Sequence, residues 1–196
     1  MTLRICVATK NEHKVHEIAL VLPSVIELAI EELDIDVEED GETFIENSII
    51  KALEYGKHLN EPVVADDSGL SIDALDGFPG VMSARYMEGH SYIEKMESIL
   101  TLLKNSAVRS ARFVCAATYF NPQSKFLLSV EGYVHGTIAY EIRGEQGFGY
   151  DPIFIPDGYD QTFGELGKDV KKFISHRSNA FKKLFDLLLK TGEIHE

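Results

Sequence analysis

The segment at residues 63–69 limits the possible folds of this chain more than any other stretch. Residues 63–65 are apolar and follow Pro62, which ends the preceding helix, so we expect a short buried strand there. Asp66 and Asp67 come next, and two adjacent carboxylates are costly to desolvate unless a cation meets them. Because successive strand side chains point to opposite faces, one aspartate could hold a metal or activate water while the other anchors a turn. An Asx turn that closes the strand is the simpler interpretation, and it stays open here.

Composition narrows the class of protein. A chain of 196 residues with 44% hydrophobic and 26% charged residues can bury a real core, and we expect a single domain, residues 1–196, with two lobes. The net charge of −13 argues against a nucleic acid polymer or an anionic membrane as partner. No signal peptide or membrane span is visible, and Cys6 and Cys115 lack CxxC spacing, so we expect a cytoplasmic protein with reduced thiols. The seven histidines show no HExxH pattern, which argues against zinc.

Strands and helices follow one another along the whole chain. Apolar runs predict strands at residues 3–8, 24–29, 63–65, 70–75, 111–120 and 126–139. Capping residues and helical periodicity predict helices that begin near Asn11, Thr43, Ser91, Thr162 and Ser178. In the helix after Thr43 the expected inner face is Ile45, Ile49, Ala52, Leu53 and Gly56, and in the last helix it is Phe181, Leu184, Phe185 and Leu188.

Two loops carry cations or aromatic residues that suggest a ligand. Lys10 and Lys14 lie at the start of a helix, where they oppose the helix dipole; a bound phosphate would resolve that conflict, and a solvated lysine pair is the alternative. Residues 143–152 combine three glycines with two aromatic residues, which suits the close approach of a planar ligand but also an ordinary mobile loop. Near the start of the last helix, His176 and Arg177 offer planar donors that could read the edge of a heterocycle.

Taken together, five segments occur in an informative order: Thr9-Lys10-Asn11-Glu12-His13-Lys14, Ala65-Asp66-Asp67-Ser68-Gly69-Leu70, Phe78-Pro79-Gly80 with Ser83-Ala84-Arg85-Tyr86, Phe148-Gly149-Tyr150-Asp151-Pro152, and Ser175-His176-Arg177. In this combination the chain closely resembles the inosine triphosphate pyrophosphatase family over nearly its whole length. The resemblance implies an α/β fold, with a long mixed β-sheet flanked by helices and an active-site cleft between two lobes. It also implies hydrolysis of ITP, dITP and XTP to the monophosphate and pyrophosphate, a Mg²⁺ cofactor and a homodimer.

The resemblance also assigns roles to individual residues. Asp67 would be the general base, and Glu39 and Asp67 would bind the metal. The substrate-binding residues that it implies are Thr9, Lys10, Asn11, Glu12, His13, Lys14, Ser68, Phe148, Gly149, Tyr150, Asp151, Lys171, His176 and Arg177. The chain departs from the family at Lys10, where many members have glycine, and Glu39 is flanked by Glu38 and Asp40, which are alternative ligands.

Two other functions remain as alternatives. A nucleotide sensor without turnover would keep the lysines and Arg177 but would not need Asp67. A Maf-type pyrophosphatase that acts on pyrimidine or modified nucleotides also opens with a strand and a phosphate-binding turn. The Ser175-His176-Arg177 and Phe148-Gly149-Tyr150-Asp151 motifs argue against the second alternative.

Overall fold

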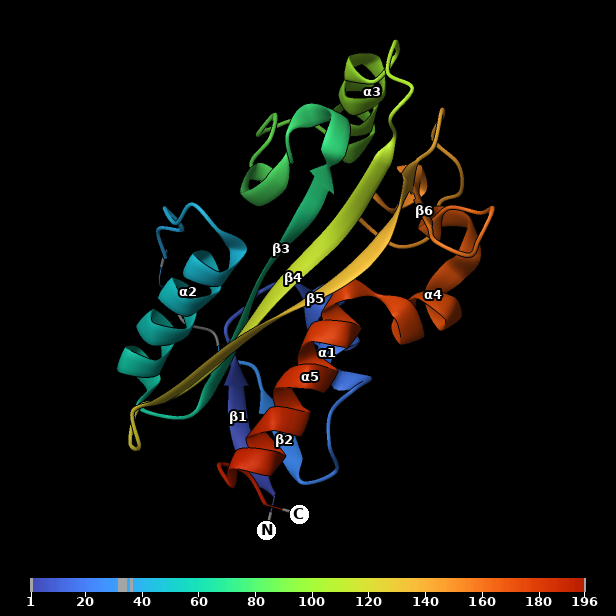
Figure 1. Cartoon of the computed structure of the whole chain (residues 1–196). Coiled ribbons are helices and arrows are strands. Elements are labelled where there is room, and N and C mark those ends of the chain that lie inside the picture. Colours follow the sequence, from blue (N-terminus) through green and yellow to red (C-terminus); the bar gives the residue numbers. More distant parts are fainter. Residues whose placement is uncertain (1, 32–34, 36, 196) are drawn as a thin grey trace. The chain divides into compact units, whose positions relative to one another are not determined.

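A computed structural model describes residues 2–31, 35 and 37–195 (Figure 1). Its strands are β1 (Leu3–Val7), β2 (Ile26–Ala29), β3 (Val63–Ile72), β4 (Ser110–Asn121), β5 (Phe126–Ile138) and β6 (Phe154–Pro156). Its helices are α1 (Glu12–Ala19), α2 (Phe44–Leu59), α3 (Tyr92–Leu102), α4 (Phe163–Ile174) and α5 (His176–Thr191). Short 3₁₀ turns cover Asp73–Leu75, Gly80–Met82 and Asp151–Ile153. Part of the expected acidic loop, residues 32–34 and 36, lies outside the described residues.

The strands form one mixed sheet in the order β2-β1-β3-β4-β5-β6. β1 pairs in parallel with β2 and with β3, whereas β5 and β6 are antiparallel. Helices flank the sheet, which confirms the predicted α/β class (Figure 1). No helix in the described part of the chain combines the length and apolar composition needed to cross a membrane.

The chain divides into two compact units. Unit 1 comprises residues 1–67, 115–132 and 176–196, and unit 2 comprises residues 68–114 and 133–175. Unit 1 contains β1, β2, α1, α2 and α5, and unit 2 contains α3, α4 and β6, while β3, β4 and β5 each contribute to both.

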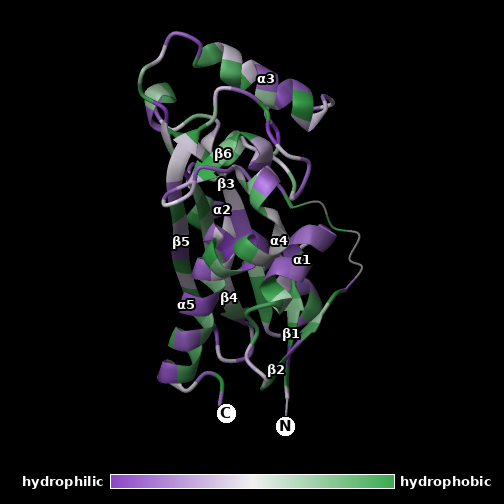
Figure 2. Ribbon diagram, turned by 90° about the vertical axis from the view of Figure 1, so that its right-hand side faces the viewer, coloured by the Kyte–Doolittle hydropathy of each residue, from purple (hydrophilic) through white to green (hydrophobic). Residues whose placement is uncertain are grey.

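In unit 1 the sheet carries apolar clusters on both faces. Val64 belongs to the cluster formed with α1 and α5, whose predicted inner face, Phe181, Leu184, Phe185 and Leu188, is fully buried. Val63 and Ala65 belong to the other cluster, formed with α2. Helix α5 has green hydrophobic and purple hydrophilic residues on different sides, as expected for a helix that covers a core (Figure 2). The alternation along β3 therefore fixes which helices its later residues face.

The core of unit 2 joins the second half of β3 to α3 and α4. Leu70 and Ile72 from β3 pack with residues such as Met96, Ile99 and Phe163. The rings of Phe113 in β4, Phe154 in β6 and Phe163 in α4 pack against one another at its centre. The centroids of the Phe154 and Phe163 rings are 5.6 Å apart. This core holds the chain segment that runs from β6 into α4.

Two expectations about β3 and the residues that follow it were wrong. Residues 66–69 do not form a turn, because β3 continues without a break from Val63 to Ile72. A Cβ at Gly69 would lie 2.4 Å from the Ser83 Oγ atom, so glycine is needed here for close packing against the following segment rather than for a turn. Residues 73–75, expected to extend a second strand, form a 3₁₀ turn instead.

Candidate active site

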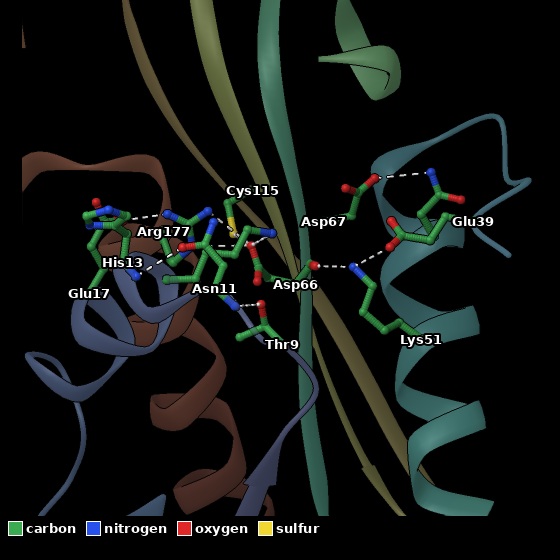
Figure 3. A network of polar contacts seen from close by, with 12 residues as sticks. Thr9, Asn11, His13, Glu17, Glu39, Lys51, Asp66, Asp67, Cys115 and Arg177 are labelled. Atoms are coloured by element: carbon green, nitrogen blue, oxygen red, sulfur yellow. Dashed lines mark hydrogen bonds and ion pairs between the residues drawn. The ribbon is translucent and has the colours of Figure 1, made fainter. Parts of the chain in front are cut away.

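Asp66 and Asp67 lie side by side in β3, and their side chains point to opposite faces of the strand. Both residues are buried, with exposures of 1% and 8%. Asp66 follows Val64 toward α1 and α5, and Asp67 follows Ala65 toward α2 (Figure 3). The prediction that the two side chains point to opposite faces is therefore confirmed, whereas the turn that one of them was expected to anchor is absent because β3 continues through both residues.

Asp66 is the centre of a buried charge cluster within unit 1. Its Oδ2 atom lies 3.1 Å from Lys14 Nζ and accepts hydrogen bonds from Arg177 Nε at 3.2 Å and Nη2 at 3.1 Å. Its backbone carbonyl accepts a hydrogen bond from Lys51 Nζ at 2.9 Å. Burial alone would raise the pKa of Asp66, but the charges of Lys14 and Arg177 outweigh it and hold that pKa well below its usual range. Asp66 is therefore an anion at neutral pH that holds two cations in place.

Arg177, in the first turn of α5, is almost completely buried. Its exposure is 1%, and besides the two hydrogen bonds to Asp66 it donates one from Nη1 to Glu17 Oε2 at 2.5 Å. Burial acts to lower the pKa of Arg177, but the two carboxylates outweigh it and raise that pKa. The guanidinium that was predicted to read the base is thus held by two carboxylates in this structure.

Asp67 has a different environment on the α2 side. Its Oδ2 atom accepts a hydrogen bond from Asn47 Nδ2 at 3.1 Å. Burial raises the pKa of Asp67, the nearby carboxylate of Glu39 raises it further, and the ammonium of Lys51 opposes both effects. Lys51 Nζ also pairs with Glu39 Oε1 at 2.8 Å. A carboxylate with a raised pKa, next to a second carboxylate and a lysine, is a candidate proton acceptor.

The predicted phosphate-binding segment leads from β1 into α1. Asn11 caps α1 by accepting a hydrogen bond from the His13 N–H at 3.0 Å, and Thr9 Oγ1 accepts one from the Asn11 N–H at 3.2 Å. Residues 10–13 are exposed. A pocket of about 250 Å³ in unit 1 is lined by Ala8, Thr9, Lys10, Ile35, Val37, Glu39, Lys51 and Tyr55. The pocket thus joins the first part of this segment to the carboxylate and lysine beside Asp67.

The donor set beside Asp67 is compatible with magnesium. The described residues contain no group of three or more His, Cys, Asp or Glu side chains placed to hold a metal. Asp67 and Glu39 do lie close enough for one carboxylate to raise the pKa of the other. Mg²⁺ is commonly bound by one or two protein carboxylates together with waters and substrate phosphates. These two residues therefore suit a metal whose coordination is completed by the substrate.

Unit 2 contains the second group of predicted ligand-binding residues. Asp151 is 1% exposed, and its Oδ2 atom accepts hydrogen bonds from Lys171 Nζ at 2.7 Å and from the Phe148 N–H at 2.8 Å. Lys171 Nζ also lies 4.2 Å from the centre of the Phe148 ring. Gly149 has a φ of +66°, which favours glycine at the turn between these residues. Asp151 thus fixes both the loop and the lysine.

Several other predicted ligand-binding residues occupy different surroundings. Tyr150 is only 3% exposed, and its hydroxyl donates to the Ser83 carbonyl at 2.9 Å inside unit 2. Ser68, the first residue of unit 2, is half-buried. His176 begins α5 in unit 1 and is 4% exposed. The ring of Tyr150 therefore supports the core of unit 2.

Lys14, Arg177 and Glu39 were predicted from the sequence, but the groups that α2 places near the two aspartates were not. Asn47, Lys51 and Tyr55 follow one another at i, i+4 spacing on the buried edge of α2. The expected inner face, which included Ile45 and Ile49, was therefore partly wrong. The detectable signal was a row of polar residues at helical spacing.

Comparisons with known proteins identify the family. The model of the Ham1 family matches residues 5–187. The "dITP/XTP pyrophosphatase" of Bacillus subtilis is 46% identical over 193 residues, which cover 93% of this chain and 95% of that protein. The protein of the same name from Synechocystis sp. is 42% identical over 179 residues and 91% of each chain. The solved Ham1 structure from Staphylococcus aureus has a TM-score of 0.87 and 41% identity, covering 97% of this chain and 100% of that one. The HAM1 structure from Coxiella burnetii has a TM-score of 0.88 and 38% identity, covering 96% and 100%. The chain belongs to the Ham1 family.

Proposed function

We propose that this protein hydrolyses non-standard purine nucleoside triphosphates, namely ITP, dITP and XTP, to the nucleoside monophosphate and pyrophosphate. One observation in unit 1 carries the proposal. Asp67 is buried beside Glu39, and Lys51 forms an ion pair with Glu39. Family membership and the names of the relatives support the same reaction. Hydrolysis removes these nucleotides from the pool, so the enzyme acts on small molecules rather than on polymers.

Asp67 is the general base in this proposal. Hydrolysis of a phosphoanhydride requires a water molecule to lose a proton as it attacks phosphorus, and pyrophosphate leaves. A carboxylate whose pKa is raised by burial accepts that proton more readily than an exposed one. Asn47 holds one oxygen of Asp67, so the direction of the carboxylate is fixed before substrate binds.

Glu39 and Asp67 would hold the magnesium ion. When bound, the metal supplies positive charge that neutralises the phosphates and favours ionisation of a nearby water. The residues of the protein contribute the remaining charge. Lys51 neutralises Glu39, and Lys10 and Lys14 lie on the segment that leads from β1 into α1.

The polyphosphate tail is assigned to residues 9–14. The positive end of the α1 helix dipole and the lysines of this segment match a polyanion. Asp66 holds Lys14 by an ion pair of 3.1 Å, so the ammonium is positioned before the substrate arrives. Lys10 is exposed and lines the 250 Å³ pocket, which is consistent with a phosphate contact.

Recognition of the base and its attached groups is assigned to Ser68, residues 148–151, Lys171, His176 and Arg177. Phe148 offers a ring face for stacking, which Lys171 covers in this structure. Arg177 supplies donors that match the 6-oxygen of hypoxanthine and xanthine.

The proposal also covers the oligomeric state and the cellular compartment. We assign a homodimer, because the family resemblance implies one. Light scattering at micromolar concentration is the test, and a mass near 22 kDa, that of one chain, contradicts the assignment. We assign the cytoplasm, because Cys6 and Cys115 are both free thiols and its substrates belong to the nucleotide pool.

A nucleotide panel tests the proposed function. Wild-type protein is incubated with Mg²⁺ and each of ITP, dITP, XTP, ATP, GTP, CTP and UTP, and pyrophosphate and orthophosphate are assayed separately. We expect pyrophosphate, with little orthophosphate, from the first three nucleotides. Binding of ITP without any product indicates a sensor, and a preference for pyrimidine nucleotides indicates the Maf-type alternative.

A further inference from the structure

Asn47 lies in the first turns of α2 and is completely buried, with an exposure of 0%. Both ends of its amide are hydrogen-bonded. Nδ2 donates to Asp67 Oδ2 at 3.1 Å, and Oδ1 accepts from the Gly41 N–H at 2.8 Å. Because the Gly41 N–H is a donor and the Asp67 carboxylate is an acceptor, the amide can satisfy both only in this orientation. A single side chain therefore connects the proposed base to the acidic loop.

The contact with Gly41 fixes the loop that carries Glu39. A Cβ at Gly41 would lie 2.8 Å from Asn47 Oδ1 and 2.7 Å from the Glu46 Cβ atom, so the loop packs closely on the start of α2. The next two N–H groups, of Glu42 and Thr43, both donate to the Glu46 carboxylate. Glu39 is two residues before Gly41 and therefore has little freedom to move relative to α2.

Asn47 and Lys51 contact the two carboxylates in different ways. Lys51, one turn further along α2, pairs with Glu39 and supplies charge. Asn47 has no charge and instead fixes geometry, since it bonds Asp67 directly and Glu39 through the Gly41 backbone. A buried amide is costly to desolvate unless both ends are bonded, so its position depends on both contacts.

We propose that Asn47 is a positioning residue that sets the mutual placement of Asp67 and Glu39 for metal binding and water activation. This inference rests on the proposed function, because it assumes that these two carboxylates hold the metal. It assigns to Asn47 no contact with substrate. Mutating a residue that orients a metal ligand typically lowers metal affinity or activity by about 10–100-fold.

Asn47→Ala is the test variant and Ser48→Ala is its matched control. Ser48 is the next residue and is also fully buried, but its hydroxyl bonds the Thr118 hydroxyl and the Ile45 carbonyl, away from both carboxylates. Two readouts are measured: binding of Mn²⁺ to metal-free protein by electron paramagnetic resonance without nucleotide, and the separate kcat and KM for ITP.

For Asn47→Ala we expect Mn²⁺ affinity and kcat to fall by about 10–100-fold, with KM for ITP nearly unchanged. Ser48→Ala should leave both readouts near wild type. Equal behaviour of the two variants overturns the inference, as does a wild-type protein that binds no Mn²⁺. Gly41→Ala is the second test, because its new Cβ displaces the loop while Asn47 and Asp67 are unchanged. It should also weaken Mn²⁺ binding, and if Asn47→Ala does not fold, a wild-type Mn²⁺ affinity of Gly41→Ala overturns the inference.

The two hypotheses fail in different ways. If the wild type releases no pyrophosphate from any nucleotide, the proposed function is wrong, whereas weaker Mn²⁺ binding in Asn47→Ala still supports the positioning role. If the wild type hydrolyses ITP and Asn47→Ala matches Ser48→Ala, the function stands and the positioning role is wrong.

Discussion

The carboxylates of Asp66 and Asp67 are adjacent in the chain, yet their pKa values are shifted in opposite directions. Asp66 is surrounded by the cations of Lys14 and Arg177, and its pKa is lowered despite complete burial. Asp67, on the other face of β3, has its pKa raised by burial and by Glu39. Neighbouring titratable groups whose pKa values are pushed apart by their environments usually serve different roles. Asp66 is suited to organising charge, and Asp67 to accepting a proton.

Replacing Asp67 with asparagine should remove the proton acceptor while keeping the shape of the side chain. We expect kcat for ITP to fall by about 10²–10⁴-fold, the usual contribution of a general base. Calorimetric titration with a non-hydrolysable ITP analogue should show an affinity similar to that of the wild type. If Asp67→Asn hydrolyses ITP at nearly the wild-type rate, Asp67 is structural and another group accepts the proton.

Replacing Asp66 with asparagine should instead destabilise unit 1. The change leaves Lys14 and Arg177 with less negative charge in a buried cluster, and breaking one partner of a buried ion pair typically costs about 3–5 kcal/mol. Urea unfolding at pH 7 measures the loss. Asp73→Asn is the control, because Asp73 is an exposed aspartate whose ion pair with Arg112 spans 3.9 Å, and it should change stability by less than about 1 kcal/mol.

The same variant should reveal a pH dependence. The pKa of Asp66 in the folded protein is below its reference value of 3.8, so its stabilising effect is fully present above that value and is lost as the pH falls toward the folded pKa. The difference in unfolding free energy between wild type and Asp66→Asn, measured without metal, should therefore be constant from pH 6 to 8 and shrink below about pH 4. A difference that stays constant down to pH 3 contradicts the ion-pair interpretation.

Activity should depend on a hard divalent cation. Asp67 and Glu39 offer carboxylate oxygens, and the substrate offers phosphate oxygens, so we expect Mg²⁺ to support turnover and Mn²⁺ to replace it. Excess EDTA should abolish pyrophosphate release, and added Mg²⁺ should restore it. Full activity in EDTA contradicts the assignment of Glu39 and Asp67 as metal ligands.

Most of the fold could be predicted from local patterns. Apolar runs located β1, β4 and β5 to within one residue at each end, and capping boxes at Thr43 and Ser91 located the starts of α2 and α3. The error in β3 has a physical cause. Asp66 and Gly69 disfavour a strand locally, but ion pairs around Asp66 and close packing at Gly69 favour one, and both depend on residues far away in the sequence.

The site was predictable only in part, for a related reason. Because successive side chains of a strand point to opposite faces, the opposite directions of the Asp66 and Asp67 side chains could be predicted without any knowledge of tertiary structure. The polar edge of α2 was missed because apolar periodicity was used to assign its inner face. Asn47 and Lys51 are buried because carboxylates from other segments meet them, and those contacts cannot be read from the helix itself.

Selectivity for the base provides the last prediction. Hypoxanthine and xanthine carry an oxygen acceptor at the 6-position, whereas adenine carries an amino donor. Arg177 has only donors and cannot lose its proton, so adenine would place donor against donor in a desolvated site. Such mismatches can reduce kcat/KM by roughly 10⁴-fold. We therefore expect the wild type to prefer ITP and XTP to ATP by orders of magnitude, and Arg177→Ala to lose far more activity on ITP than on ATP.

The structure adds a control for this experiment. Arg177 is also paired with Glu17, so Arg177→Ala removes a buried ion pair as well as a base contact. Glu17→Ala breaks the same pair but keeps the guanidinium. Both variants should lose stability in urea unfolding, because each removes one charge from the buried cluster around Asp66. Only Arg177→Ala should reduce the ratio of kcat/KM for ITP to that for ATP. If Arg177→Ala lowers kcat/KM for both nucleotides equally, Arg177 binds the phosphates and the base is recognised by other residues.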